Sequence, residues 1–213
     1  MTRHSSLAAR EHVAGRLHGT VPGGDPLDGW IAGLTPEQTA ELRQHLPAQF
    51  TRAAVMVPLV ERADGLTVLL TQRASHLKNH PGQISFPGGR MEPDDAGPWE
   101  AAIRETREEI GLPSTHASLA GYLHDHVVLT GYVITPAVAF VRPGFTLALD
   151  RTEVDDVFEV PLEFILDPAH HVPRKRTFAG HEFLTHDIPY GERHIWGATA
   201  GMLLSLYRLL QEG

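Results

Sequence analysis

Three glutamates, Glu105, Glu108 and Glu109, lie within five consecutive positions of the segment "AAIRETREEIGL", residues 101–112. At about 100° per residue they share one side of a helix, and both arginines of the segment fall on its other flank. Like charges at this spacing cost about 0.2–0.5 kcal/mol per pair, and no lysine offsets the repulsion. Carboxylate oxygens suit Mg²⁺ or Mn²⁺. The cluster therefore predicts a divalent-cation site, with a solvated helix face as the alternative.

The segment around these glutamates has clear helix boundaries. Pro98 suits the first helical turn, and Gly111 suits the left-handed position that follows a helix. A stripe of mostly apolar residues, about 120° from the acids, should face the core. Its members are Trp99, Ala102, Ile103, Thr106 and Ile110. Just before the helix, "SFPGGR" predicts a tight turn with backbone groups open to a ligand.

Runs rich in apolar and β-branched residues predict strands on both sides of this helix. "AAVMVPLV" and "LTVLLTQR" flank Asp64-Gly65 and indicate a hairpin. Further short strands are expected in "GQISFPGG", "ASLAGYL", "HVVLT", "YVITPAVAFV" and "EVDDVFEVPL", with a second hairpin over residues 172–188. Apolar residues at helical spacing from Ile195 to Leu210 predict a closing helix. The fold class is therefore α/β (α+β).

Residues 1–50 differ in composition from the rest. "TVPGGDPLDGW" is rich in turn residues, and Thr35 with Pro36 predicts the start of one short helix. We expect a loose N-terminal arm with this helix over residues 1–50, followed by the main domain over residues 51–213.

The composition excludes several classes of protein. The chain has 213 residues, a formal net charge of -8 and no cysteine. A net negative charge argues against nucleic acid as a partner, and the lack of cysteine excludes disulfides and thiolate metal sites. Since no leader or membrane-spanning run is evident, we expect a cytoplasmic protein with no membrane partner.

Residues 88–112, "GGRMEPDDAGPWEAAIRETREEIGL", resemble the Nudix box, in which a glycine and a glutamate precede the pattern Arg-Glu-aliphatic-x-Glu-Glu-x-Gly-aliphatic. Two positions depart from the family pattern. Thr106 stands at an aliphatic position, and Asp95 stands at the first glutamate position with one extra residue before Arg104. The matching residues are Arg104, Glu105, Glu108, Glu109, Gly111 and Leu112.

The one-residue expansion is a feature of a Nudix subgroup, the coenzyme A pyrophosphatases. Residues 69–89, "LLTQRASHLKNHPGQISFPGG", are similar to the signature that precedes the box in that subgroup. "TGYVITPAV", "EVDDVFEVPL" and "WGATAG" resemble it too, so the likeness covers about residues 52–212. It implies the Nudix fold, in which a mixed β-sheet is sandwiched between α-helices.

The resemblance implies metal-dependent hydrolysis of coenzyme A to 3′,5′-ADP and 4′-phosphopantetheine, with Mg²⁺ or Mn²⁺ as cofactor. Glu105 and Glu109 become the leading metal ligands, Glu108 a further ligand or a water-orienting group, and the Gly89 carbonyl a contributor to the coordination shell. The general base stays open between Glu105 and Glu153, which could equally be an ordinary strand-end carboxylate. Arg104 is expected to pair with a carboxylate of the box.

A polyanionic substrate needs cationic contacts that a net charge of -8 does not supply. Arg73, Lys78 and His80 are the candidates, with ordinary surface charge as the alternative. Tyr132 could stack on the adenine or belong to the core. The pair of imidazoles in "HDH", residues 124–126, could bind zinc, but no third ligand stands at a recognisable spacing.

Other functions remain open on the sequence alone. The same chemistry could act on ADP-ribose, a dinucleotide or an acyl-CoA, and a Nudix module can also sense nucleotides without catalysis. A homodimer is neither indicated nor excluded.

Overall fold

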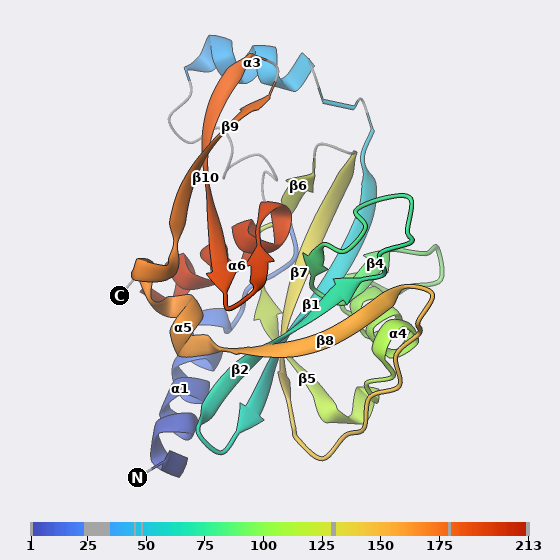
Figure 1. The fold of residues 1–213 in the computed structure, drawn as a ribbon, viewed down its shortest axis with the longest axis vertical. Coiled ribbons are helices and arrows are strands. Elements are labelled where there is room, and N and C mark those ends of the chain that lie inside the picture. Colours follow the sequence, from blue (N-terminus) through green and yellow to red (C-terminus); the bar gives the residue numbers. More distant parts are fainter. Residues whose placement is uncertain are drawn as a thin grey trace.

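The computed structural model describes residues 2–23, 35–44, 46–47, 49–128, 131–178 and 180–211. Within these residues the strands form an eight-stranded and a three-stranded sheet. Helices lie on both sides of the larger sheet (Figure 1). The predicted α+β class is confirmed.

The larger sheet has the strand order β3-β2-β1-β7-β5, with β4 beside β1, β6 beside β7 and β8 beside β2. Strands β1 and β7 are parallel and their neighbours antiparallel, so the sheet is mixed. Its strands are β1 (Thr51–Arg62), β2 (Gly65–Arg73), β3 (Ile84–Ser85), β4 (Gly88–Arg90), β5 (Ala117–Tyr122), β6 (His126–Val128), β7 (Tyr132–Val141) and β8 (Val154–Pro161). The smaller sheet holds β9 (Val172–Phe178), β10 (His181–Tyr190) and β11 (Arg193–Ile195).

The helices are α1 (Thr2–Leu17), α3 (Pro36–Gln44), α4 (Pro98–Ile110), α5 (Leu162–Leu166) and α6 (Gly197–Gln211), with short 3-10 turns at Ser114–His116 and Pro168–His170. In Figure 1, α4 lies on one side of the sheet and α1 and α6 lie on the other, while the β9–β10 hairpin extends away from the sheet.

Strand β1 separates two apolar cores because its side chains alternate between the faces of the sheet. Val55 and Val57 pack with α1 and α6 in one core, whereas Ala54 and Met56 pack with α4 in the other. A strand covered on both faces reads as a continuous apolar run, as β1 does.

A short segment fills the gap where β1 and β2 diverge, and it positions the site. Strand β1 pairs with β2 only from Leu59 onward. Before that point β4 takes the place of β2, with Gly89 opposite Ala54, while β3 pairs with the far end of β2. The stretch from β3 to β4 therefore joins both long strands.

The predicted first hairpin is confirmed, with its turn one residue earlier than expected. Gly65 pairs with Arg62, so Ala63 and Asp64 form the two-residue loop and Gly65 opens β2. Its φ of +141° explains why a glycine stands there. The second hairpin, β9–β10, and the strands β5, β7 and β8 are confirmed as well.

The two ends of the chain differ from the predictions. The expected loose start contains the helix α1, whose Val13 and Leu17 are buried in the core. The closing helix begins at Gly197, not at Ile195, which belongs to β11. The division of the chain at residue 50 stays a prediction, and the turn-rich stretch near residues 20–30 lies largely outside the described residues.

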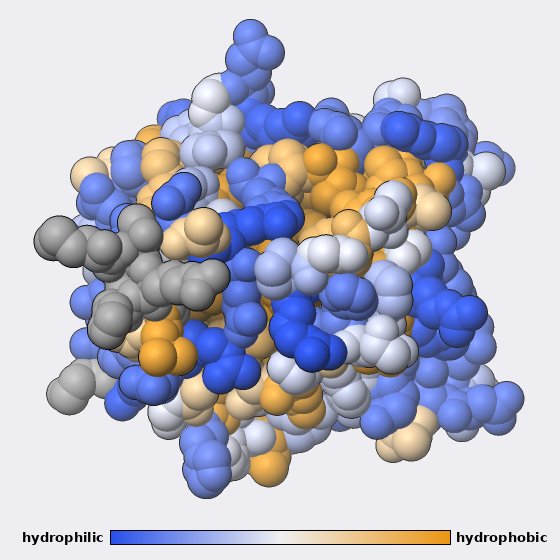
Figure 2. Space-filling model, turned by 90° about the horizontal axis from the view of Figure 1, so that it is seen from below, coloured by the Kyte–Doolittle hydropathy of each residue, from blue (hydrophilic) through white to orange (hydrophobic). Residues whose placement is uncertain are grey.

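On the face shown in Figure 2, patches of apolar surface lie among hydrophilic groups. Among the residues described, none of the helices combines the length and the apolar character that a membrane span requires.

Candidate active site

Helix α4 carries the acidic cluster with the boundaries that its sequence predicts. Pro98 opens the helix, and Gly111 closes it with a left-handed φ of 69° and an N–H that donates to the Arg107 carbonyl. Ala102, Thr106 and Ile110 are buried as expected.

Glu109 does not fit the alternative of a solvated helix face. It is only 5% exposed, because β4 packs over it. The Gly88 N–H donates to its Oε2 over 3.0 Å. Glu105 is partly covered, with its side chain 18% exposed, and Glu108 is open at 60%. The three carboxylates thus range from buried to exposed.

Arg104 confirms the expectation that it pairs with carboxylates of the box. Its guanidinium holds Asp95 through two bonds of 3.0 and 2.8 Å. It also donates to Glu105 over 2.9 Å and to Glu108 over 3.2 Å. The Arg104 guanidinium lowers the pKa of Asp95 below its ordinary value. One arginine therefore fixes the loop before the helix to the acidic face.

The role of Asp95 was not predicted, although its position in the box was a usable signal. An aspartate one residue farther from Arg104 than the family pattern still reaches the guanidinium with both oxygens. The loop before α4 is one residue longer than in the family pattern, and aspartate stands in it where the pattern has the longer glutamate.

Gly88 and Gly89 let the backbone of β4 approach its neighbours closely. A Cβ on Gly89 would lie 2.6 Å from the Glu105 carboxyl carbon. A Cβ on Gly88, which has φ +145°, would lie 2.4 Å from the Ala54 carbonyl oxygen. At Gly88 only glycine fits, because a side chain would meet the backbone of β1, whereas at Gly89 a side chain would have to displace the Glu105 carboxylate.

The electrostatics of the cluster oppose full ionisation. Burial raises the pKa of Glu109 to about 8, and the charges of Glu153 and Glu105 add to the effect. Burial likewise raises the pKa of Glu105, against the pull of Arg104, and Glu108 and Glu153 raise it further. Added positive charge would relieve this repulsion.

Glu153 lies close enough to act on both buried acids, although it comes from a distant part of the chain. It is exposed and directly precedes β8. Its carbonyl accepts the Ala74 N–H over 2.8 Å, which places it beside the end of β2. The structure therefore brings the two candidate bases, Glu105 and Glu153, to one site.

Arg73 ends β2 on the same side of the sheet. Its charge lowers the pKa of Glu109. Among the described residues its buried Nε finds no hydrogen-bond acceptor. Leaving a buried donor unsatisfied costs about 1–3 kcal/mol, so such a group is a candidate for contact with a ligand.

The donor set fits a hard divalent cation in its chemistry. Glu105, Glu108, Glu109 and Glu153 offer carboxylate oxygens, and Gly89 lies beside the Glu105 carboxylate. As the side chains stand, no three metal-ligating groups of the described part of the chain converge on one point. Arg104 bonds to one oxygen of Glu105 and to one oxygen of Glu108, so these hydrogen bonds leave the second oxygen of each carboxylate for a cation.

The other predicted substrate contacts lie at the borders of the site. Lys78 and His80 are exposed in the loop between β2 and β3, where His80 adopts a φ of +55°. Tyr132 is 39% exposed at the start of β7, opposite Thr51. At about 3.3 Å per residue, that position lies about 10 Å along β1 from the Ala54–Gly89 pair.

The zinc alternative gains no support. His124 is exposed, whereas the ring of His126 packs against Gly201 of α6, where a Cβ would lie 2.6 Å away. Burial lowers the pKa of His126 to about 4. Within the described residues neither belongs to a group of three metal-ligating side chains.

The chain belongs to the Nudix family: the family model of the NUDIX domain matches residues 50–180. It is a hydrolase that acts on pyrophosphate bonds.

Curated relatives agree. The Nudix hydrolase NudL of Enterobacter sp. (strain 638), whose name calls it uncharacterized, is 38% identical over 73% of this chain and 80% of its own. NudL of Escherichia coli (strain K12) is 35% identical over 81% and 87%. A solved structure from Deinococcus radiodurans has a TM-score of 0.50 at 15% identity, over 76% of this chain and 88% of that one, which is a likeness of fold.

Proposed function

We propose that this Nudix hydrolase cleaves the pyrophosphate bond of coenzyme A or a derivative, yielding 3′,5′-ADP and 4′-phosphopantetheine. The support is the segment 69–89, which resembles the signature of the coenzyme A pyrophosphatases. This segment folds as the end of β2, the loop after it, and β3 with the start of β4. It thus supplies Arg73, Gly88 and Gly89 to the acidic cluster.

The unpartnered Nε of Arg73 is the observation that carries the proposal. It is buried beside a glutamate whose pKa is raised, within the part of the chain that the structure describes. A phosphate oxygen would satisfy this donor with a charge-assisted hydrogen bond. The pyrophosphate would then lie between Arg73 and the acidic face of α4.

The acids of the site divide the work. We assign the divalent cations to Glu105, Glu108, Glu109 and the Gly89 carbonyl. When bound, Mg²⁺ or Mn²⁺ would neutralise charge on the pyrophosphate and activate the attacking water. Arg104 keeps Glu105 oriented through its fork to Asp95. We assign the 3′-phosphate to Lys78 and His80, which are exposed on the loop between β2 and β3.

Either of two carboxylates can accept the proton of the attacking water. Glu105 is the more buried of the two, and Glu153 is exposed to solvent. If Glu153 is the base, Glu153→Gln should lower kcat while leaving KM and the binding of the cations little changed. Glu105→Gln lowers kcat in either case because Glu105 is also assigned to the cations.

The substrate is tested by offering coenzyme A, ADP-ribose and a dinucleoside polyphosphate at equal concentration with Mg²⁺, and by resolving the products. We expect the highest kcat/KM for coenzyme A. Much faster turnover of ADP-ribose would refute the assignment to coenzyme A while leaving the Nudix chemistry intact. Binding of these compounds without any turnover would favour the nucleotide sensor.

A further inference from the structure

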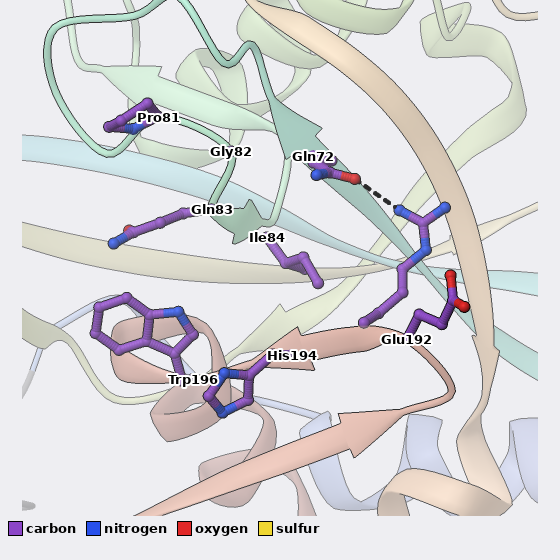
Figure 3. Close-up of a pocket in the computed structure, with 9 residues that line it drawn as sticks. Gln72, Pro81, Gly82, Gln83, Ile84, Glu192, His194 and Trp196 are labelled. Carbon is purple, nitrogen blue, oxygen red and sulfur yellow. Dashed lines mark hydrogen bonds between the residues drawn. The ribbon is translucent and has the colours of Figure 1, made fainter.

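A hollow lies near the end of β2, away from the acidic cluster. It is a cavity of about 750 Å³ between the loop that leads into β3 and the strand β11. Figure 3 shows Pro81 and Gln83 of the loop on one side and His194 and Trp196 on the other. Its volume falls in the range of small-molecule sites, about 300–1,000 Å³.

The basic side chains at this cavity, Arg193 and His194, already have protein partners. Arg193 donates to Gln72 over 2.9 Å and to Asp156 over 2.5 Å. His194 lies 3.0 Å from the Asp187 carboxylate. Glu192 also lines the cavity and adds a negative charge. Because the basic groups are already paired and this acidic group repels anions, the cavity suits an uncharged group and not a phosphate.

Trp196 offers that group a flat surface. The Arg176 guanidinium lies 4.9 Å from the centroid of the indole ring, and the ring also lines the cavity. A planar heteroaromatic group entering the cavity can stack on the indole, which is held by this cation–π contact. The side-chain amides of Gln72 and Gln83 offer both hydrogen-bond donors and acceptors for its edge.

The cavity connects directly to the acidic cluster. Gln72 lines the cavity, and the next residue, Arg73, acts on Glu109. Adjacent residues of a strand point to opposite faces, so one strand end serves both places. The Arg73 N–H also donates to the Gln83 carbonyl over 2.9 Å. A ligand that passes around the end of β2 can therefore contact both.

We propose that this cavity binds the nucleobase of the substrate, stacked on Trp196, while the pyrophosphate lies at the acidic cluster. The inference rests on the proposed cleavage of a nucleoside diphosphate derivative and adds where the base is held. The runner-up occupant is the amide-bearing arm of 4′-phosphopantetheine, and the experiment separates the two.

The test measures binding of AMP and of 4′-phosphopantetheine by calorimetry, in the presence of Mg²⁺. Neither compound contains a pyrophosphate bond, so neither is consumed. With Trp196→Ala we expect about 10-fold weaker binding of AMP, since stacking of a base on an aromatic side chain is typically lost on such a change. Binding of 4′-phosphopantetheine should be unchanged, and Trp196→Phe should keep AMP within about 3-fold of the wild type.

Two further variants control for folding. Leu184→Ala removes an exposed apolar side chain of β10 and should leave AMP binding unaltered. Gln83 lies on the loop that leads into β3, and Gln83→Ala should weaken the binding of AMP about 3-fold. The inference therefore remains testable if Trp196→Ala does not fold. The inference is overturned if Gln83→Ala and both Trp196 variants bind AMP as tightly as the wild type does. It is also overturned if these variants weaken the binding of 4′-phosphopantetheine and not that of AMP.

The outcome is distinct from that of the proposed function. If coenzyme A is not hydrolysed but AMP binding depends on Trp196, the cavity assignment stands and the substrate assignment fails. If coenzyme A is hydrolysed and the Trp196 variants bind AMP like the wild type, the cavity assignment fails alone.

Discussion

Arg73 and Arg193 are both associated with the end of β2, and they differ in what surrounds them. In the part of the chain that the structure describes, the buried Nε of Arg73 has no acceptor, and the acids near it resist ionisation. Arg193 is held by Gln72 and Asp156 and lies 4.0 Å from the centroid of the Phe158 ring. The arginine on the α4 side of the sheet therefore has a donor without an acceptor, whereas the arginine on the cavity side is held by protein partners.

This difference suggests how the acidic cluster and the cavity divide the binding and the cleavage of one substrate. Unbalanced charge is costly in the free protein and is relieved by ions and phosphates. Paired charge holds a shape and leaves recognition to a ring surface and to amide hydrogen bonds. The comparison predicts that changes on the α4 side alter turnover and that changes on the cavity side alter binding.

The largest effect is expected for Glu105→Gln. Removing this carboxylate should lower kcat about 10³-fold if Glu105 binds the cations as proposed. AMP binding at the cavity should change less than about 3-fold. Steady-state kinetics with saturating Mg²⁺ measure the first, and calorimetry the second.

The matched control for this change is Glu100→Gln, at an exposed position in the first turn of the same helix. It should turn over at the wild-type rate. Loss of activity in this control, or retention of activity in Glu105→Gln, would contradict the division of labour.

Gly89→Ala should lower kcat about 10²-fold with little change in Tm. The added methyl group displaces the end of a flexible side chain, the Glu105 carboxylate, which would otherwise lie 2.6 Å away. Gly88→Ala is the comparison, since its methyl group meets the backbone of β1 at a positive φ and should prevent normal folding. Kinetics and thermal melts of both proteins check this; equal Tm losses would rule out the distinction.

Glu109→Gln should stabilise the cation-free protein at alkaline pH. The folded state raises the pKa of Glu109 from 4.5 to about 8, so it keeps a proton that the unfolded chain releases. The contribution of Glu109 to stability is therefore full below about pH 4.5 and is lost as the pH rises toward 8.

The variant should gain about 2–3 kcal/mol over the wild type at pH 8 and almost nothing at pH 5. Denaturant melts in the presence of a chelator at both pH values measure it. A gain of the same size at pH 5 would mean that the effect does not come from ionisation.

Arg104→Lys should have the smallest effect, about a 10-fold loss of kcat and about 1 kcal/mol of stability. Lysine keeps the charge but cannot hold both oxygens of Asp95 while contacting Glu105. Arg107→Lys, an exposed change on the same helix, is the control and should resemble the wild type. Steady-state kinetics and thermal melts of Arg104→Lys and Arg107→Lys decide whether the two hydrogen bonds from the Arg104 guanidinium to Asp95 matter beyond the charge of Arg104.

Helix α4 could be predicted because its signals are local. Pro98 and Gly111 mark its ends, and the apolar spacing between them marks its buried face. The burial of Glu109 could not, because the covering strand β4 is brought there by its pairing with β1. Long-range packing decides exposure, and one helix read alone cannot show it.

The missed elements have equally specific reasons. Helix α1 buries Val13 and Leu17 one turn apart but lacks a long apolar stripe. Ile195 fits the helical spacing of α6 as well as the alternation of β11, and Gly197, with φ +63°, separates the two. Asp95 and Trp196 stood in segments that resembled the family. The contact of Asp95 depends on how the loop before α4 folds back on the helix, and that of Trp196 depends on Arg176 of another strand.

The stretch from Gln83 to Gly89 contacts both places that the substrate would occupy, the cavity and the acidic cluster. Its carbonyl at Gln83 accepts from Arg73, its carbonyl at Pro87 accepts from Met56, and its amide at Gly88 donates to Glu109. A ligand that pushes this stretch outward at the cavity must also shift the amide that holds Glu109. Occupancy of the base-binding side could thus be sensed at the reacting bond through a few peptide units, with no movement of a whole domain.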